Sequence, residues 1–272
     1  MSLRIQNNLE AFNAHRQLSA TSNMQAKSME KLSSGYRINR ASDDAAGLAI
    51  SQKLSAQVSG LGQATRNAAD AISLVQTGEG ALAEVHSMLQ RVRDLAVQYN
   101  NGTLSSSDKT AITDEVGQLC AEVNRIGSDT KFNGISLLTG SASISFQVGA
   151  EDAQTISANA VSLFGAGGSY NVDSGIFSFS GTVSLSNIDT AIQNVSSARS
   201  TFGSVQNRLE HTINNLTTLE ENLQASESRI KDVDMAKEMV NFTKLNILQQ
   251  AGTSMLAQAN QSSQGVLSLL RG

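Results

Sequence analysis

The residues in this sequence that could do chemistry are few and lie far apart. The three histidines are His15, His86 and His211, and the one cysteine is Cys120. No His-Glu-x-x-His zinc motif, nucleophile elbow, Walker loop or cysteine pair occurs in the chain. We therefore expect no enzyme activity, no cofactor and no metal site, and we interpret Cys120 as a small, half-buried hydrophobic residue.

Asp43 and Asp44 form an acidic pair that could bind a metal ion or act as acid and base. No third ligand follows at a useful spacing, and Ser42 is a good N-cap for a helix that starts just after it. The two carboxylates would then lie beside the positive end of the helix dipole. We interpret this pair as part of a helix cap.

The rest of the chain is organised around residues 188–233, where apolar or small residues recur at alternating steps of three and four. A step that averages about 3.5 residues keeps one seam facing a partner helix, which is typical of a coiled coil. The seam consists of Ile188, Ala191, Val195, Ala198, Phe202, Val205, Leu209, Thr212, Leu216, Leu219, Leu223, Ser226, Ile230 and Val233. A second long pattern starts at Leu54, and a third runs from Ile112 to Ile126, so these stretches are expected to be its antiparallel partners.

Composition agrees with long helices. The chain has 272 residues and no proline, and a proline inside a helix would kink or break it. A net charge of -4 without a basic cluster gives no footprint for nucleic acid, and no run of 18 apolar residues predicts a membrane span. The first twenty residues also lack the pattern of a cleaved secretory signal.

Between about 130 and 186 the period changes to two, which predicts a β region. Ile144, Phe146 and Val148 alternate with polar residues, and 176–179 and 182–185 read as further strands. The glycine run 165–168 is interpreted as a turn, because no lysine or helix follows it as in a phosphate loop.

The two ends of the chain carry apolar residues that one intrachain partner would not cover. Residues 3–32 have a thin stripe, and 235–271 have a seam through Leu245, Leu248, Gly252 and Met255, with Leu256 and others off that line. A helix that is apolar on several sides must be surrounded, so we expect subunits to associate through both ends. Contacts of this kind that do not close would give a helical filament.

The sequence therefore predicts a mainly α fold: a long antiparallel coiled-coil or helical-bundle rod with a small β-hairpin excursion, plus a coiled coil of the terminal helices. Beyond these patterns, the chain resembles the bacterial flagellins, the subunits of the flagellar filament. The resemblance covers roughly 1–140 and 188–272. Its motifs are Glu30-Lys31-Leu32-Ser33-Ser34-Gly35, Arg37-Ile38-Asn39-Arg40, Asp43-Asp44-Ala45-Ala46-Gly47-Leu48-Ala49-Ile50-Ser51, Leu89-Gln90-Arg91-Val92-Arg93-Asp94-Leu95-Ala96-Val97-Gln98, Phe132-Asn133-Gly134, Glu227-Ser228-Arg229-Ile230, Asp232-Val233-Asp234-Met235-Ala236 and Val266-Leu267-Ser268-Leu269-Leu270-Arg271.

The resemblance implies that residues 1–41 and 236–272 form an inner coiled-coil domain, that about 33–46 connect it, and that 42–235 form a helical shell domain. It also implies a homopolymer that drives swimming motility. The residues expected to carry polymerisation are Ile5, Leu9, Phe12, Leu245, Leu248, Met255, Leu256, Val266 and Leu269. Leu256, off the main seam, is expected to face another subunit.

Further partners and a location follow from the same resemblance. It implies export to the extracellular filament through the flagellar secretion apparatus, a chaperone on the C-terminal helix, and cap and hook-junction proteins. It also implies binding by the innate immune receptor Toll-like receptor 5 through Gln90, Arg91, Leu95 and Glu115. A hook-filament junction protein and an intracellular coiled-coil scaffold are the alternative functions.

Overall fold

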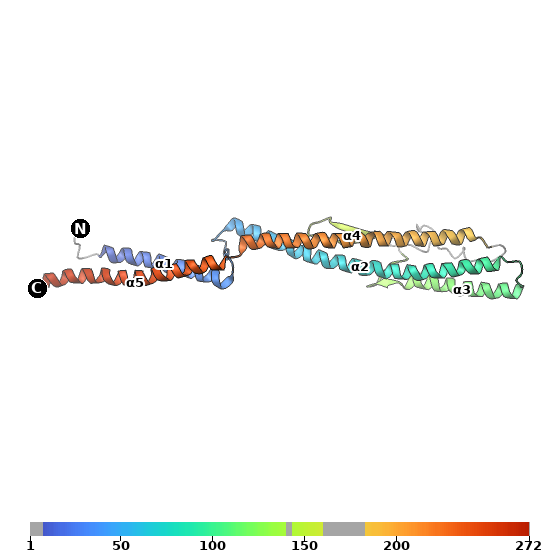
Figure 1. Ribbon diagram of the computed structural model, residues 1–272, viewed down its shortest axis with the longest axis horizontal. Coiled ribbons are helices and arrows are strands. Elements are labelled where there is room, and N and C mark those ends of the chain that lie inside the picture. The colour runs from blue at the N-terminus through green and yellow to red at the C-terminus, as the bar shows by residue number, and fades with distance from the viewer. Residues whose placement is uncertain (1–7, 140–142, 160–182, 272) are drawn as a thin grey trace. The chain divides into compact units, whose positions relative to one another are not determined.

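The computed structural model describes residues 8–139, 143–159 and 183–271, with side chains as far as residue 261 (Figure 1). The chain divides into two compact units: a terminal unit of Met1–Ala56 with Asn222–Gly272, and a central unit of Gln57–Glu221. Five helices and four short strands occur among the described residues, so the mainly α fold class with a small β excursion is confirmed.

In the terminal unit, α1 (Leu9–Ser34) and α5 (Met235–Arg271) lie side by side and run antiparallel (Figure 1). Near one end of the pair, the Asn8 side-chain amide donates a 2.9 Å hydrogen bond to the Ala259 carbonyl. Towards the other end, the Ser28 hydroxyl donates a 2.5 Å hydrogen bond to the Glu238 carboxylate. The Asn8 side chain also caps α1 by accepting from the Ala11 N–H.

The segment that follows α1 is joined by backbone hydrogen bonds to the segment that precedes α5. α1 stops at Gly35, whose φ of 76° lies in the left-handed region that glycine adopts without strain. The Val233 N–H donates to the Gly35 carbonyl over 3.0 Å, and the Arg37 N–H donates to the Lys231 carbonyl over 2.7 Å. Ile38 follows and is only 2% exposed. The chain therefore leaves both helices at one ordered junction.

The central unit contains most of α2 (Ala45–Tyr99) and α4 (Leu185–Lys231), together with α3 (Ser106–Asp129). α2 and α4 run antiparallel, since Glu79 pairs with Arg199 and Arg93 pairs with Asp189. α3 is antiparallel to α2 as well, because Arg91 in the last turns of α2 pairs with Glu115 in the first half of α3, and Val123 further along α3 packs in the same core cluster as Leu82 further back along α2. Short connections make sequential helices antiparallel neighbours, as the sequence predicts.

The core of the central unit follows the predicted seam. Eight of its positions are buried in α4, namely Ile188, Ala191, Val195, Ala198, Phe202, Val205, Leu209 and Leu216. Six of them, Ala191 to Leu209, share a core cluster with α2 residues such as Leu82, Val85 and Leu89, each 0% exposed, and Ile188 belongs to a second cluster with Val92 and Leu95. Beyond Leu216 the seam opens, and Leu219 is 44% exposed.

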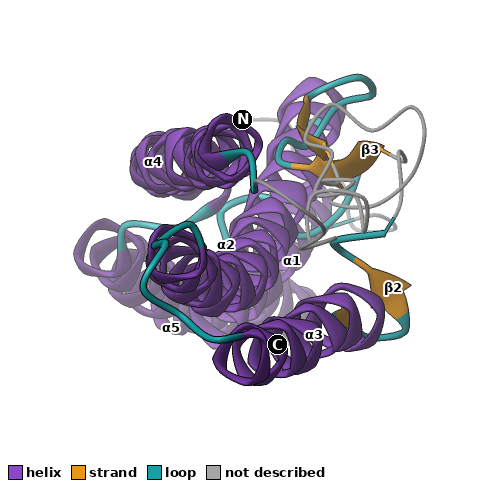
Figure 2. Cartoon of the chain, turned by 90° about the vertical axis from the view of Figure 1, so that its right-hand side faces the viewer, coloured by secondary structure: helices purple, strands orange, loops and turns teal. Residues whose placement is uncertain are grey.

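Two antiparallel hairpins complete the central unit. β1 (Lys131–Phe132) pairs with β2 (Ile135–Ser136) across Asn133-Gly134, where φ is 48° and 81°, as a two-residue hairpin turn requires. β3 (Ser143–Gln147) pairs with β4 (Thr155–Asn159), and Ile156 and Ala158 of β4 reach the helical core. The strands lie beside the helices rather than between them (Figure 2).

Three expectations from the sequence need comment. The cap of α2 is Asp44 rather than Ser42, since α2 begins at Ala45 and the Asp44 carboxylate accepts from the Gly47 N–H over 2.9 Å. The predicted strand at 182–185 is wrong at its end, because Leu185 already begins α4. The glycine run 165–168 and the predicted strand 176–179 lie outside the described residues.

No helix in the described part of the chain is both long and apolar enough to cross a membrane.

Candidate assembly surface

The seam between α1 and α5 mixes apolar, small and polar residues. On α5, half-buried positions recur at steps of three and four: Glu238, Phe242, Leu245, Gln249, Gly252, Leu256 and Ala259, with Asn246 half-buried beside them. On α1 the half-buried Ala11, Ala14, Leu18, Gln25 and Leu32 alternate with the buried Thr21 and Ser28. Small residues let the helices approach closely, and a Cβ on Gly252 would lie 3.2 Å from a methyl of Leu18.

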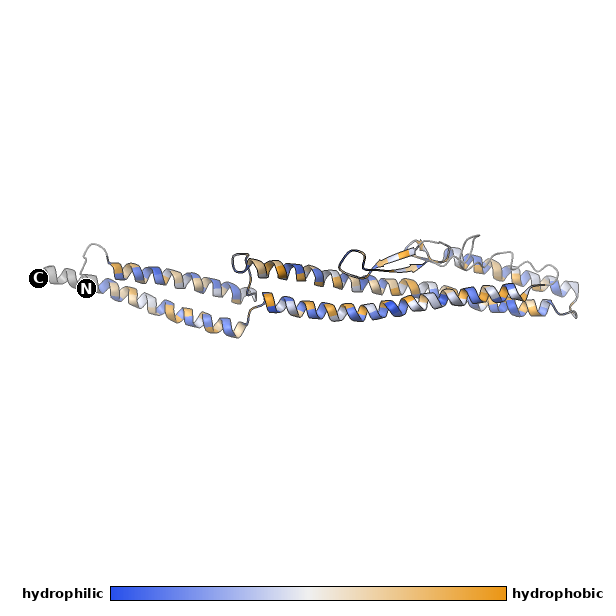
Figure 3. Cartoon of the chain, turned by 90° about the horizontal axis from the view of Figure 1, so that it is seen from above, coloured by the Kyte–Doolittle hydropathy of each residue, from blue (hydrophilic) through white to orange (hydrophobic). Residues whose placement is uncertain are grey.

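Large apolar side chains instead cover the outside of α5. Three pairs are exposed: Met235 and Met239 at 48% and 49%, Val240 and Ile247 at 70% and 61%, and Leu248 and Met255 at 46% and 65%. Members of a pair are four or seven residues apart, so each pair lies along one line of the helix. The three lines point in different directions around α5, on both flanks of the α1 seam and opposite to it. Figure 3 shows that hydrophobic and hydrophilic residues alternate along the coloured part of the terminal helices.

The structure places the predicted polymerisation residues in two groups. Leu9, Phe12, Leu248 and Met255 are exposed, at 59%, 66%, 46% and 65%. Leu245 and Leu256 are half-buried on the seam with α1, so the expectation that Leu256 lies off the seam is wrong. Its place follows from the heptad that runs through Glu238 and Phe242. Ile5 lies outside the described residues, as do the side chains of Val266 and Leu269.

Sequence reasoning left several exposed residues out of the predicted surface. These are Met24, Met29, Met235, Met239, Val240 and Ile247. The seven-residue spacing of Val240 to Ile247 was the signal that could have found that line, since it repeats the spacing of Leu248 to Met255.

The predicted receptor-binding residues lie on α2 and α3 of the central unit. The Arg91 guanidinium donates from Nε and Nη2 to Glu115 Oε1, at 2.9 and 2.7 Å, and both side chains are about half exposed, at 56% and 44%. Gln90 is exposed, and its side chain is hydrogen-bonded to the His86 ring. Leu95, in contrast, is only 2% exposed and packs in the core with Val116 and Ile188. The expected insertion of Leu95 into a partner is therefore wrong for this conformation.

Electrostatics in the central unit come from isolated surface groups. The side-chain hydrogen bond from Ser105 lowers the pKa of Asp108 at the start of α3, and the ion pair with Asp189 raises the pKa of Arg93. Burial raises the pKa of the Cys120 thiol to about 12, which keeps it protonated and poorly nucleophilic. No group of three potential metal ligands occurs within the described ranges.

The described geometry is that of a structural protein: long helices with one dense core, and a terminal helix pair with apolar lines on several sides. Comparison with known proteins gives the family. The model of the bacterial flagellin N-terminal helical region matches residues 5–143, and that of the bacterial flagellin C-terminal helical region matches residues 185–270. The chain belongs to the bacterial flagellin family.

Two similar flagellins align with nearly the whole chain, and one solved structure aligns with most of it. A flagellin of Halalkalibacterium halodurans is 52% identical, covering 98% of this chain and 99% of its own. A flagellin of Bacillus subtilis is 47% identical, covering 99% of this chain and 100% of its own. A putative flagellar hook-associated protein of Vibrio parahaemolyticus shares the fold, with a TM-score of 0.59, 18% identity, and coverage of 70% of this chain and 100% of that one.

The chain is accordingly a structural subunit of the bacterial flagellar filament, which serves motility. The filament is extracellular, and the subunits form it as a homopolymer. This confirms the filament function expected from the sequence.

Proposed function

We propose that the terminal unit polymerises through the apolar lines of α5 and the exposed apolar residues of α1. The observation that carries this proposal is that the three apolar lines lie on parts of the α5 surface that α1 does not cover. Each line buried in the filament contributes about 25 cal/mol for every square ångström of apolar surface removed from water. One α1 helix cannot cover three directions, so contacts from at least two further helices are needed.

The residues take different roles in this surface. Leu248 and Met255 form one contact line, and Leu9 and Phe12 extend the surface along α1. Leu245 and Leu256 hold α1 against α5, so their contribution to assembly is indirect. Ile5, Val266 and Leu269 complete the set of residues that we assign to polymerisation. In the filament, residues 1–41 and 236–272 make the inner layer and 42–235 the shell, with 33–46 as connector.

A matched pair of leucines tests this assignment. Leu248 on α5 and Leu219 on α4 are 46% and 44% exposed, so an aspartate is equally tolerable at either position in the monomer. If Leu248 is buried on assembly, Leu248→Asp places an unpaired charge in an apolar contact, at a cost of several kcal/mol. Leu248→Asp should abolish seeded filament growth with its circular dichroism unchanged, whereas Leu219→Asp should still grow. Equal growth of the two variants would contradict the assignment.

The exposed apolar lines also support the remaining partners. A chain with such surfaces needs protection before assembly, so we assign α5 to an export chaperone, and the same helices to contacts with cap and hook-junction proteins at the ends of the filament. We assign export to the flagellar secretion apparatus. The protein acts by assembly and not by catalysis.

The paired residues Arg91 and Glu115, with Gln90, form the surface for Toll-like receptor 5. Arg91 is held in place by Glu115, so its planar guanidinium is ordered and half exposed, which suits an interface hot spot. Leu95 contributes indirectly, because it packs α2 against Val116 of α3 and Ile188 of α4. Monomer should activate the receptor, and intact filament should do so poorly because neighbouring shells cover this surface.

Arg93 provides the control for Arg91. It is two residues away and also forms an exposed ion pair, but with Asp189 of α4. In a cell reporter assay on depolymerised protein, Arg91→Ala should weaken signalling, whereas Arg93→Ala should signal as the parent does. Equal loss in both variants would assign the effect to general surface charge, and equal potency of monomer and filament would contradict the covered surface.

A further inference from the structure

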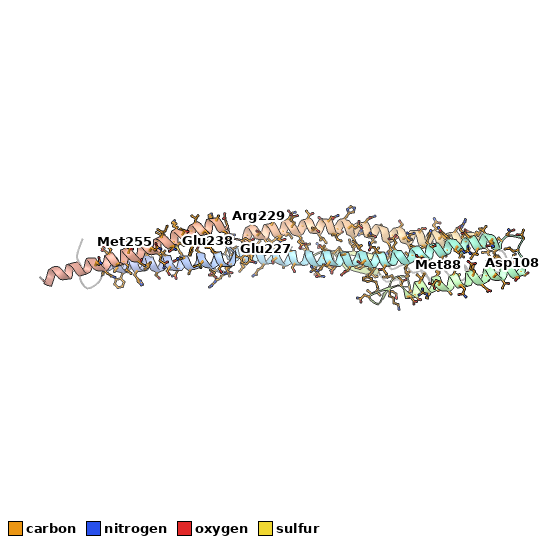
Figure 4. All side chains as sticks on the ribbon, turned by 60° about the horizontal axis from the view of Figure 1, so that its bottom comes forward. Met88, Asp108, Glu227, Arg229, Glu238 and Met255 are labelled. Carbon is orange, nitrogen blue, oxygen red and sulfur yellow. The ribbon has the colours of Figure 1, made fainter. Side chains whose placement is uncertain are left out.

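The methionines of this protein are unevenly distributed over its surface. The five methionines in the described part of the terminal unit are 48–65% exposed: Met24 and Met29 on α1, and Met235, Met239 and Met255 on α5. Met88 of the central unit is half-buried and packs against the core. Figure 4 labels Met255 and Met88, one example of each kind. All exposed methionines in the described part of the chain therefore belong to the unit that carries the proposed assembly surface.

These exposed side chains combine two properties. A thioether is flexible and apolar, so it fits an irregular contact between helices. Its sulfur is also open to a two-electron oxidation by a hydroperoxide. The sulfur lone pair attacks a peroxide oxygen, the O–O bond breaks and the S=O bond of methionine sulfoxide forms. Hydrogen peroxide is thereby reduced to water. Methionine sulfoxide reductases reverse the step with a thiol reductant, and the oxygen leaves as water.

We propose that Met24, Met29, Met235, Met239 and Met255 are a reversible oxidation site of the free subunit, and that their sulfoxides block its assembly. This inference rests on the assembly surface proposed above. Met255 shares its line with Leu248, and Met235 and Met239 make up a line of their own, so a sulfoxide there places a polar acceptor in an apolar contact. A buried acceptor without a donor is unfavourable.

The fold should survive the same oxidation. No methionine lies on the α1–α5 seam as described, and the central core is made of residues other than the five exposed methionines. The effect is therefore separable from unfolding. It also depends on timing, because contacts that cover the five thioethers in the filament would protect them from peroxide. Subunits are sensitive before assembly and resistant after it.

The experiment uses the full chain, depolymerised and treated with hydrogen peroxide. Peptide mass spectrometry should show the gain of one oxygen at the five exposed methionines before Met88. The critical concentration for seeded growth should rise at least about tenfold, since each buried unpaired acceptor alone is worth that order. Melting of the central unit should be unchanged. Methionine sulfoxide reductases A and B with dithiothreitol should restore growth.

Two variants assign the effect to these positions. The variant Met24→Leu/Met29→Leu/Met235→Leu/Met239→Leu/Met255→Leu keeps volume and apolarity, and should grow equally with and without peroxide. Met88→Leu should remain as sensitive as the parent. Unchanged growth of the oxidised parent, or failure of the reductases to restore it, would overturn the inference even if the leucine variant does not fold. Failure of the untreated parent to grow would overturn the proposed assembly surface, and this inference with it.

Discussion

The two units of this protein use antiparallel helices for opposite purposes. In the central unit, α2 and α4 meet through apolar side chains, and Leu82, Leu89 and Leu209 are each 0% exposed. In the terminal unit, α1 and α5 meet through a mixture of apolar, small and polar residues that includes Leu256 and Ser28, while Val240 and Ile247 are 70% and 61% exposed. The α2–α4 pair buries its apolar surface within the chain, whereas the α1–α5 pair leaves apolar surface exposed, where neighbouring subunits can contact it. The difference teaches that the same heptad spacing can serve folding or assembly.

The strongest way to break this comparison is to separate the units. A fragment of residues 42–235 should fold on its own, because almost the whole described core lies within it. It should melt cooperatively by circular dichroism and form no filaments. The terminal segments alone should show little helix, since isolated helices depend on burying an apolar face. Non-cooperative melting of the fragment would show that the central core depends on the terminal unit.

A pair of truncations sharpens the comparison within the intact chain. Leu209→Ala removes a fully buried side chain and should destabilise the central unit by about 2–5 kcal/mol. Met255→Ala removes a side chain that is 65% exposed, so melting of the monomer should change little. Assembly should respond in the opposite order, with the critical concentration raised by Met255→Ala. Denaturant unfolding and seeded growth measure the two effects, and a similar loss of stability in both variants would contradict the contrast.

Whether the sequence alone predicts which residues a helix buries depends on how many apolar lines run along that helix. α4 has one seam, so its spacing identified the buried residues from Ile188 to Leu216 directly. α5 has apolar residues in several directions, and spacing alone did not indicate which direction faces α1. The sequence placed Leu245, Leu248 and Met255 on one seam, whereas in the structure Leu245 is half-buried there with Leu256, and Leu248 and Met255 are exposed. The contact is set partly by polar and small residues, which hydrophobic periodicity does not detect.

Local chemistry was predicted unevenly for a similar reason. The cap of α3 is Ser105, but Ser106, Ser107 and Asp108 beside it are cap residues too, so the sequence alone restricts the cap only to 105–108. Ser42 and Asp44 are both good cap residues, so sequence preference could not choose between them. β4 escaped prediction because Ile156 and Ala158 make only a short alternation, and their burial depends on the helices they contact. The assembly surface itself lies between copies, so its assignment stays a prediction.

Two glycines in α2 test how tightly the central helices pack. A Cβ on Gly78 would lie 2.8 Å from Cε2 of Phe202, whereas nothing lies within 4 Å of a Cβ on Gly80. Gly78→Ala should therefore destabilise the central unit by about 1–3 kcal/mol through overpacking. Gly80→Ala should stabilise it by up to about 1 kcal/mol, because alanine favours the helix. Equal shifts of the denaturant midpoint in the two variants would show that α2 and α4 do not meet as closely as Gly78 indicates.

The smallest expected effects come from the helix caps, which differ between the units as the seams do. The cap of α3 is local: the Ser105 hydroxyl accepts from the Asp108 N–H, and the Asp108 carboxylate accepts from the Ser105 N–H and hydroxyl. The cap of α1 reaches further, since Asn8 also donates to Ala259 of α5. Ser105→Ala should lower the stability of the central unit by ~1 kcal/mol, and Asn8→Ala should leave that unit unchanged while loosening the α1–α5 pair.

The pH dependence of the α3 cap follows from Asp108. Hydrogen bonds from Ser105 lower the pKa of the Asp108 carboxyl below 3.8, so the folded chain favours the ionised form of Asp108. This contribution to stability is fully present above the unfolded pKa and is lost as the pH falls through the lower, folded value. The difference in melting temperature between the parent and Asp108→Asn should thus be largest near neutral pH and shrink below about pH 4. A difference that grows on acidification would contradict the assignment, and thermal melts monitored by circular dichroism measure it.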